Sequence, residues 1–447
     1  MGTPIHQSTG FAHDIADNGA VLEALRQPQP LPSHARLMAL DSVWMEGDAV
    51  RQLARVAEMP DCQAAVGMPD LHAGPGIPIG AALAFGASIH PHLVGGDAGC
   101  GARVLALGKL KIRGDALERR AREVFSASAF GTILADPDSG ELDEDELLEA
   151  VWHRGARAFA TLPGVDEALA EFAVGEVEPD WLPVSSELPE FLRGYARSLG
   201  TIGGGNHFVE LGAIGRIFDQ GAAEALGLER RGHAILAHSG SRGLGKALAD
   251  HWGPVALLDE DEQQRYLGQL AGAVRFAIAN RLLLAWRMAQ ACGCARDNRI
   301  LGGFDLVHNF VAREATGDAR EGWVHRKGCA PAMSGAPTVI LGSRGAPSWI
   351  MQGCGNQACL CSVAHGAGRR MTRSEARSKL GDRYRGGKGR KPVRSDSGGR
   401  LLCDDKHLIF EEHPDAYKAI DPVIASLEAA GAATRVAALD PLLTVKL

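Results

Sequence analysis

The chain has 447 residues, of which 45% are hydrophobic and 23% are charged, a composition typical of a soluble globular protein. Its formal net charge of −7 argues against a generally basic nucleic-acid binder. No apolar run reaches the roughly 18 residues that a membrane-spanning helix needs, and residues 1–20 lack the charged-then-apolar pattern of a signal peptide. Nine cysteines, an odd number, fit free thiols in a reducing compartment. We therefore expect a cytoplasmic protein without a membrane partner.

The N-terminal part of the chain is expected to pass from a lead-in to a helix, then to strands and then to helices. Residues 1–40, rich in Pro, His and Gln, are predicted to be a poorly structured lead-in, and residues 41–447 a single domain. Apolar residues at helical spacing predict a short helix between residues 41 and 60. Residues 61–108 have the pattern of short strands and Gly-rich loops, and residues 112–198 that of charged helices.

The C-terminal part begins with a second Gly-rich block, LGTIGGGNHFVELG, followed by the strand-like HAILAHS. Residues 260–291 form the clearest predicted helix, with one apolar stripe, and residues 300–366 return to short strands. Thr372 and Glu375 have the spacing of a capping box, which predicts a helix in TRSEARSKL. Residues 381–400 are expected to be a mobile basic loop, and DPLLTVKL a closing strand. Together the elements predict an α+β fold in one large mixed domain.

Charge is unevenly distributed along the chain. Residues 135–150 are acidic, whereas residues 369–394 carry eleven Lys or Arg against two acids. A solvated loop is the usual meaning of such a basic run. Because the run begins four residues after His365, it also fits contacts with a phosphate backbone.

His365 lies in the stretch SVAHGAGRRMTR. Small residues stand on both sides of it, and three arginines follow later in the stretch. A buried, hydrogen-bonded histidine at a turn is the simplest interpretation of a lone histidine. The neighbouring glycines, Gly366 and Gly368, would also let a ligand approach the backbone closely, and the arginines would supply charge for phosphate.

A second set of candidates consists of Asp, Cys and His residues that each end a strand or occupy a Gly, Ser or Asn loop. They are Asp97, Cys100, His207, His238 and His308. Such a mixture of hard and borderline-soft donors suits Mn²⁺, Zn²⁺, Co²⁺ or Fe²⁺ better than Mg²⁺ or Ca²⁺, and a thiolate can bridge two ions in phosphoryl chemistry. The spacing matches no zinc-finger or H-E-x-x-H pattern, so the spacing alone leaves the ligand set open.

Cys354, Cys359 and Cys361 raise the possibility of a separate zinc site. Three thiols lack a clear fourth partner there, so packed thiols are the preferred interpretation.

The chain resembles the RtcB family of RNA ligases from about Val43 to Lys446. The similarity rests on the number and order of the following motifs: MPDLHAGPGIPIG, VGGDAGCG, GGGNHFVE, HSGSRGLG, HN at 308–309, VHRKG, LGS, HGAGRRMTR and DAYKAID. It implies an RtcB-like fold around a central metal and nucleotide cleft, and an enzyme that joins RNA 3′-phosphate or 2′,3′-cyclic phosphate ends to 5′-hydroxyl ends.

The resemblance also implies roles for individual residues. Asp97, Cys100, His207, His238 and His308 would bind two Mn²⁺ ions, with Cys100 bridging, and His365 would be the nucleophile that takes GMP from GTP. Asp70 matches a family acid that would orient a neighbour or help to open a cyclic phosphate. The implied nucleotide pocket comprises Asn206, His207, Glu210, His308, Asn309, Gly342, Ser343, Ser348, Gly366, Ala367, Gly368, Tyr417 and Lys446.

Several positions depart from the common family pattern. Arg344 stands in LGSRG in place of methionine, VHRKGCAPA lacks an arginine that many members carry nearby, and Leu447 replaces glycine. The GSRG variant resembles a bacterial branch linked to repair of damaged RNA more than to tRNA splicing. None of the departures removes an implied metal ligand or the nucleophile, so substrate choice is what they affect.

Three functions therefore compete. The first is a GTP- and Mn²⁺-dependent RNA ligase, with an archease-type activator as a further partner. The second is a metal-dependent phosphoesterase that opens cyclic phosphates without joining ends, and the third is a non-catalytic protein that binds RNA ends. No apolar stripe is left over for a large interface, so we expect a monomer or a weak homodimer.

Overall fold

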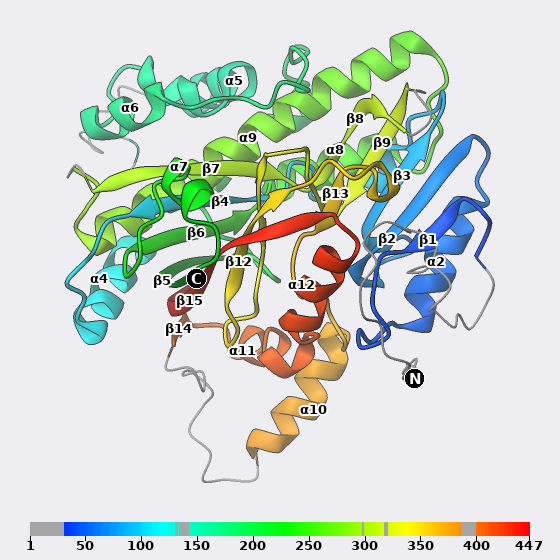
Figure 1. The fold of residues 1–447 in the computed structure, drawn as a ribbon. Helices are drawn as coiled ribbons and strands as arrows, with labels where there is room; N and C mark the ends of the chain where they lie inside the picture. The colour runs from blue at the N-terminus through cyan, green and yellow to red at the C-terminus, as the bar shows by residue number, and fades with distance from the viewer. Residues whose placement is uncertain (1–30, 130–132, 134–142, 297–298, 317–320, 386–398) are drawn as a thin grey trace.

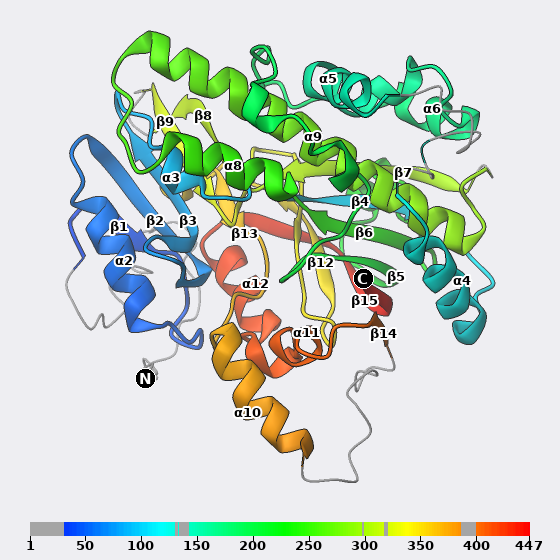
Figure 2. The same cartoon turned by 180° about the vertical axis from the view of Figure 1, so that it is seen from behind.

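The computed structural model describes residues 31–129, 133, 143–296, 299–316, 321–385 and 399–447. Within these residues the chain forms two packed sheets with helices on their outer faces (Figures 1 and 2). The α+β fold in one large mixed domain is therefore confirmed.

The smaller sheet has the strand order β1-β2-β3-β9-β8 in the described part of the chain. Its strands are β1 (Ala35–Leu37), β2 (Cys62–Ala73), β3 (Pro78–Phe85), β9 (Glu321–Lys327) and β8 (Asn309–Ala315). The pairing of β2 with β3 breaks between Gly67 and His72, so this part of β2 departs from a regular ladder. The irregular stretch matters for function because it contains Asp70.

The larger sheet has the order β11-β12-β15-β5-β6-β4-β7, and β14 also pairs with β15. Its strands are β11 (Pro337–Ile340), β12 (Ser348–Gly353), β15 (Ala433–Lys446), β5 (Phe208–Ile217), β6 (His233–Ser239), β4 (Gly101–Leu107), β7 (Ile300–Val307) and β14 (Arg400–Cys403). A separate pair joins β10 (Cys329–Pro331) to β13 (Ser362–Ala364). Most of these strands lie within the ranges expected from the sequence, but β15 begins seven residues before DPLLTVKL.

Side chains along each strand alternate between the two faces of the sheet, and this alternation explains why the two sheets stack. On β4, Ala102, Val104 and Ala106 belong to the core that also contains Val66 of β2, so this face of the larger sheet packs toward the smaller sheet. Leu105 and Leu107 point the other way, into a core shared with helices. Burial of both faces accounts for the continuous apolar character of this strand.

Helices cover the outer faces of both sheets. The smaller sheet packs against α2 (Gly47–Ala57), which confirms the helix predicted within residues 41–60. The larger sheet packs against α4 (Gly114–Ser126) and α9 (Glu260–Cys292), and α5 (Glu144–Arg154) lies outside α9 (Figures 1 and 2). The remaining helical segments are α3 (Pro91–Val94), η2 (Gly155–Ala160), α6 (Glu167–Val174), η3 (Glu190–Leu192), η4 (Ala196–Ser198), α7 (Gln220–Ala225), α8 (Arg242–Trp252), η5 (Gln357–Cys359), α10 (Arg373–Arg385), α11 (Leu408–Glu411), η6 (Pro414–Ala416) and α12 (Ile420–Ala429).

Helix α9 is buried on nearly all sides, whereas a single apolar stripe was expected. The sheet covers one side of α9, and α5 and η2 cover the other. Polar residues on the covered sides are therefore paired: Arg275 binds Glu178, and Arg281 binds Asp305 at 2.6 Å. The predicted helix and its apolar stripe are confirmed, and burial extends beyond the stripe to most of the helix.

The segments expected to be irregular are partly ordered. Residues 1–30 of the expected lead-in lie outside the described residues, but Ala35–Leu37 forms β1, parallel to residues 65–67 of β2. Residues 381–385 continue α10, so they are helix and not loop, and residues 386–398 lie outside the described residues.

The helices of the described residues include none that is long and apolar enough to cross a lipid bilayer. Among the same residues the cysteines are free thiols. Cys359 and Cys361 are buried, as expected of packed thiols, whereas Cys354 is exposed.

Candidate active site

A cavity of about 760 Å³ opens where strands from both sheets end. Its wall includes His72 of β2, Cys100 just before β4 and His238 near the end of β6. His308 lies between β7 and β8, and the segment from His365 follows β13. Polar residues from His72 to His365, 293 positions apart in the sequence, thus meet because they occupy strand ends and the loops beside them.

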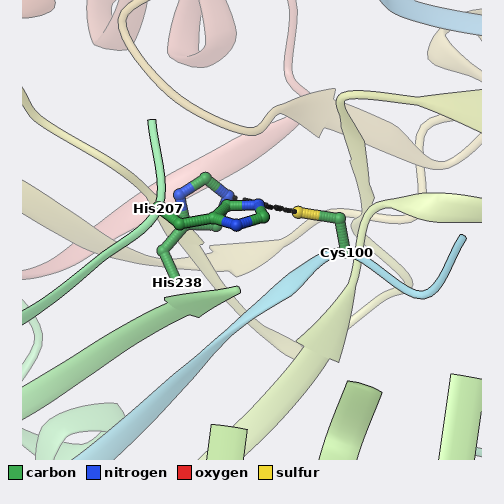
Figure 3. Close-up of side chains that lie close together, drawn as sticks. All are labelled: Cys100, His207 and His238. Atoms are coloured by element: carbon green, nitrogen blue, oxygen red, sulfur yellow. Dashed lines mark hydrogen bonds between the residues drawn. The ribbon is translucent and has the colours of Figure 1, made fainter. Parts of the chain in front are cut away.

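Cys100, His207 and His238 form a tight cluster (Figure 3), and Cys100 and His238 also line this cavity. The Cys100 sulfur lies 3.4 Å from Nε2 of His207 and 3.5 Å from Nε2 of His238. The other two predicted ligands adjoin them: Asp97 Oδ2 is 2.8 Å from His207 Nε2, and His308 Nε2 is 3.4 Å from His238 Nε2. The structure therefore brings all five predicted ligands together.

Backbone hydrogen bonds hold the cluster in place. The His308 amide donates to the Cys100 carbonyl at 2.8 Å, and the Cys100 amide donates to the Asp97 carbonyl at 3.1 Å. The side chain of Asn309 adds a third link, since its amide nitrogen donates to the Asp97 carbonyl and its oxygen accepts from the Gly328 amide. Asn309 lines the cavity, but the nitrogen and the oxygen of its side-chain amide both form hydrogen bonds within the protein.

The donor atoms of this cluster fit a metal ion. The Asn206 carbonyl can only accept, so Nδ1 of His238 carries the hydrogen and Nε2 directs a lone pair at Cys100 and His308. His308 is buried, and its Nδ1 has no hydrogen-bond partner among the described residues. A carboxylate, a thiol and imidazole nitrogens that face one another without enough hydrogens to satisfy them are suited to bind a cation.

His207 differs from the other two imidazoles. Its Nδ1 lies 3.0 Å from Arg242, which can only donate, so Nε2 carries the hydrogen that faces Asp97 and Cys100. Binding a cation through Nε2 requires that this hydrogen leave and that the contact with Arg242 be given up. Arg242 is therefore coupled to the state of the cluster.

Burial dominates the electrostatics of the cluster. It lowers the pKa of His238 and of His308 well below the usual range and raises the pKa of the Cys100 thiol. Burial also opposes ionisation of Asp97, but the adjacent His207 outweighs it and holds the pKa of Asp97 below its usual range. The protein alone thus keeps the thiol protonated, and a bound cation is what would stabilise the thiolate.

His365 lies beside this cluster, with its ring centroid 4.9 Å from that of His308. Its Nδ1 is 2.7 Å from Oδ2 of Asp70, a fully buried carboxylate. The same oxygen accepts from the backbone amides of His365 and Gly366 at 3.2 and 3.4 Å. The pair is in ion-pair contact without the geometry of a hydrogen bond, and His365 Nδ1 has no hydrogen-bond partner among the described residues. A carboxylate this close to Nδ1 favours the tautomer with its hydrogen on Nδ1, which leaves the lone pair of the neutral ring on Nε2.

The predicted nucleotide residues extend from His365 along the cavity. The wall includes Asn206, Glu210, Gly342, Ser343, Gly366, Ala367, Gly368, Tyr417 and Lys446. Burial raises the pKa of Glu210 to about 7, although the Thr444 hydroxyl, which donates to it, and Lys446 both favour its charged form. Ser348 is not part of the wall: it is buried, and its hydroxyl accepts from the Gly342 amide.

The structure adds residues that the sequence did not identify. Glu412 is buried in the wall of the cavity, accepts from the Tyr417 hydroxyl and binds Arg369 at 3.0 Å. Glu412 lies three residues before DAYKAID, and an isolated acid gives no signal of such a role. His72 was also missed, although two residues after Asp70 on a strand is a spacing that can place both side chains on one face.

The resemblance implied that Lys446 binds the nucleotide, but its ammonium group is already hydrogen-bonded within the protein. Its Nζ donates to the backbone carbonyls of Gly205 and His207 at 2.9 and 2.8 Å and lies 3.9 Å from Glu412. Lys446 therefore stabilises the position of the loop that carries His207.

Comparison with known proteins gives a consistent result. The family model described as tRNA-splicing ligase RtcB matches residues 52–259 and 254–447. The RNA-splicing ligase RtcB2 of Escherichia coli is 36% identical over 94% of this chain and 97% of its own length. The tRNA-splicing ligase RtcB of Archaeoglobus fulgidus is 31% identical over 89% of this chain and 91% of its own length. The chain belongs to the RtcB family of RNA-splicing ligases.

Proposed function

We propose that this protein is a GTP-dependent RNA ligase that joins RNA 3′-phosphate or 2′,3′-cyclic phosphate ends to 5′-hydroxyl ends. The observation that carries the proposal is the position of His365. Its ring lies beside the cluster of potential metal ligands and is oriented by a buried carboxylate in the same cavity as the nucleotide residues. A structural histidine would need neither neighbour.

The first step is transfer of GMP to His365. The lone pair on Nε2 attacks the α-phosphorus of GTP, the bond to the bridging oxygen breaks, and pyrophosphate leaves with the electron pair. The carboxylate of Asp70, 2.7 Å from Nδ1, stabilises the positive charge that develops on the ring. Gly366 and Gly368 line the cavity beside the ring. A Cβ on Gly368 would collide with the carbonyl of Asp70, so this glycine lets the segment pack closely against the strand that carries Asp70.

The second step passes GMP to the RNA 3′-phosphate, and the third joins the ends. The activated 3′-phosphorus is attacked by the 5′-hydroxyl, and GMP is the leaving group. A 2′,3′-cyclic phosphate is first opened by water. Arg344, Arg369, Arg370 and Arg373 line the cavity, so its outer part is suited to the RNA phosphates.

Guanine recognition is proposed for the part of the cavity around Glu210. A carboxylate can accept hydrogen bonds from both N1 and N2 of guanine, which adenine cannot supply in the same pattern. Tyr417 offers a ring face at the same wall. The ammonium of Lys446, which we expected to bind the base, instead supports the site through its contacts with the 205–207 loop.

Two Mn²⁺ ions are proposed to bind to Asp97, Cys100, His207, His238 and His308. When bound, they would supply positive charge to offset that of the phosphates. The mixed donor set favours a transition metal such as Mn²⁺ over Mg²⁺, which prefers oxygen ligands.

The test is incubation of the full chain with α-labelled GTP and Mn²⁺. We expect label on the protein that is stable to alkali and labile to acid, as a phosphoramidate is, and its complete loss in His365→Ala. Cys100→Ala should lose both labelling and most bound metal, measured by elemental analysis. Cys354→Ala, an exposed thiol outside the cluster, is the control and should keep both.

The two competing functions predict other results. A phosphoesterase would open cyclic phosphates in His365→Ala as well as in the wild type, without labelling. A non-catalytic RNA-end-binding protein would bind RNA equally well in Cys100→Ala. Wild-type protein that carries metal but takes up no label would contradict the ligase.

The biological setting is also a proposal. We propose repair of damaged RNA as the setting, with tRNA splicing as the alternative, because Arg344 in LGSRG resembles the branch linked to RNA repair. We propose that the enzyme acts in the cytoplasm, as a monomer or weak homodimer, and that an archease-type activator supports repeated turnover.

A further inference from the structure

His72 lines the cavity but has no part in the chemistry described so far. It lies near the end of β2, two residues after Asp70, and only 8% of its surface is exposed. Its ring is 6.5 Å from that of His365 between centroids, with an angle of 26° between the ring planes. His72 is therefore a second imidazole beside the proposed nucleophile.

The hydrogen-bond pattern fixes the state of this ring. Nδ1 of His72 lies 2.8 Å from the backbone carbonyl of Asp70, which can only accept, so Nδ1 carries the hydrogen. The lone pair is then on Nε2, which has no hydrogen-bond partner among the described residues. Burial lowers the pKa of His72 to about 4, so the ring is neutral at neutral pH. His72 thus presents an oriented and unprotonated base.

Several other bases in the described wall of the cavity are already engaged. His238 and His308 direct Nε2 at the metal-ligand cluster. Glu210 accepts from Thr444, and Glu412 from Tyr417 and Arg369. The joining step, however, needs an acceptor for the proton of the attacking 5′-hydroxyl.

We propose, on the basis of the ligase function above, that His72 is the general base of the joining step. The O5′ oxygen forms a bond to the phosphorus of the activated 3′-phosphate, and the bond from that phosphorus to the bridging oxygen of GMP breaks. GMP leaves with the electron pair, and the O5′ proton passes to Nε2 of His72 and then to solvent. The anionic phosphates in the cavity favour the imidazolium that forms.

The experiment separates the two half-reactions of the full chain. His72→Asn is the informative variant, because the asparagine amide can still donate to the Asp70 carbonyl from the Nδ1 position but offers no base at the Nε2 position. We expect labelling of His365 by GTP within about twofold of wild type. Single-turnover joining of 3′-phosphate RNA should fall about 100- to 10,000-fold, the usual contribution of a general base.

Two further variants complete the design. His72→Ala should lose joining in the same way and recover part of it when imidazole is added. His153→Asn, on the outer helix α5, is the matched control and should join at the wild-type rate. RNA ending in a linear 3′-phosphate is used so that opening of a cyclic phosphate does not limit the rate.

The outcomes distinguish this inference from the proposed function. If the wild type takes up no label, the ligase itself fails. If the wild type is labelled and His72→Asn joins RNA at the wild-type rate, His72 merely supports Asp70 and the inference is overturned. Equal loss of labelling and joining in His72→Asn would likewise overturn it, by assigning His72 to the first step.

Discussion

Glu210 is a buried carboxylate that is partly protonated and partly ionised near neutral pH. Burial raises its pKa to about 7, and the hydroxyl of Thr444 and the ammonium of Lys446 work in the opposite direction. Only the ionised form can accept from two guanine donors at once. The proposed recognition of GTP therefore depends on pH through this one residue.

We expect the KM for GTP in the labelling reaction to rise as pH falls from about 8 to 6, since Glu210 gains a proton through its pKa in this range. Glu210→Gln should raise KM about 10- to 100-fold and remove the pH dependence, because a charged hydrogen bond is lost. Thr444→Val is the matched variant: without the hydroxyl the pKa of Glu210 should rise, which moves the dependence to higher pH. A wild-type KM that does not change with pH would contradict this role.

At the same scale, the side-chain contacts explain how far the sequence could define the site. The sequence indicated the proposed metal ligands and His365 because the ligands end strands or lie in Gly, Ser or Asn loops and because the RtcB resemblance implied their roles. The sequence could not show that Lys446 bonds to two backbone carbonyls, or that Asn309 is occupied by Asp97 and Gly328. Such contacts depend on which loops meet in space.

Among the elements, α10 has the most direct connection to the cavity. Its first turn is closed by a capping box: the Glu375 amide donates to the Thr372 hydroxyl at 3.2 Å, and Glu375 accepts from the Thr372 amide at 2.9 Å. Thr372 and Arg373 line the cavity, so the cap also sets its rim.

Thr372→Ala should therefore destabilise the start of α10 by about 1 kcal/mol, the usual cost of losing such a cap. Amide hydrogen exchange in residues 373–377 should be about fivefold faster, while exchange in α9 stays unchanged. Ser374→Ala is the control, because Ser374 is exposed and its hydroxyl makes no cap hydrogen bond. Equal exchange in both variants would show that the cap does not hold the helix.

The elements also show which parts of the fold were open to prediction. The capping box and the apolar spacing are local signals, and they identified α10, α2 and α9. The extensive burial of α9 was not local: Arg281 is a charged residue in the helix, and it is paired there by Asp305 on β7 and by the backbone carbonyls of Gly99 and Ser239. β1 is only three residues long and owes its existence to its pairing with β2.

At the scale of the whole molecule, buried neutral histidines link stability to pH. His325 of β9 accepts from the His90 amide at 2.9 Å, and burial lowers the pKa of His325 to about 3 and that of His90 to about 4. The unfolded chain binds protons near pH 6.5, well above these values, so the folded state loses stability as pH falls from about 6.5 toward 4.

The free energy of unfolding, measured with urea, should therefore fall by several kcal/mol across this range. His325→Gln keeps an acceptor for the His90 amide but no longer titrates, so its stability should depend less steeply on pH, even if it is lower throughout. His153→Gln, at an exposed site, should retain the wild-type slope. Parallel slopes in all three proteins would exclude His325 as a source of the acid sensitivity.

The position of β15 has a consequence for biosynthesis. This strand lies between β12 and β5 in the larger sheet, yet it follows both in the chain. During translation the nascent chain therefore presents two open strand edges that only β15 can join. The loop that carries His207 likewise gains its hydrogen bond from Lys446 only after 239 further residues have been synthesised. In ribosome-bound intermediates the loop that carries His207 therefore lacks its hydrogen bonds to Lys446. We expect the proposed cation site to form only after Lys446 has left the exit tunnel.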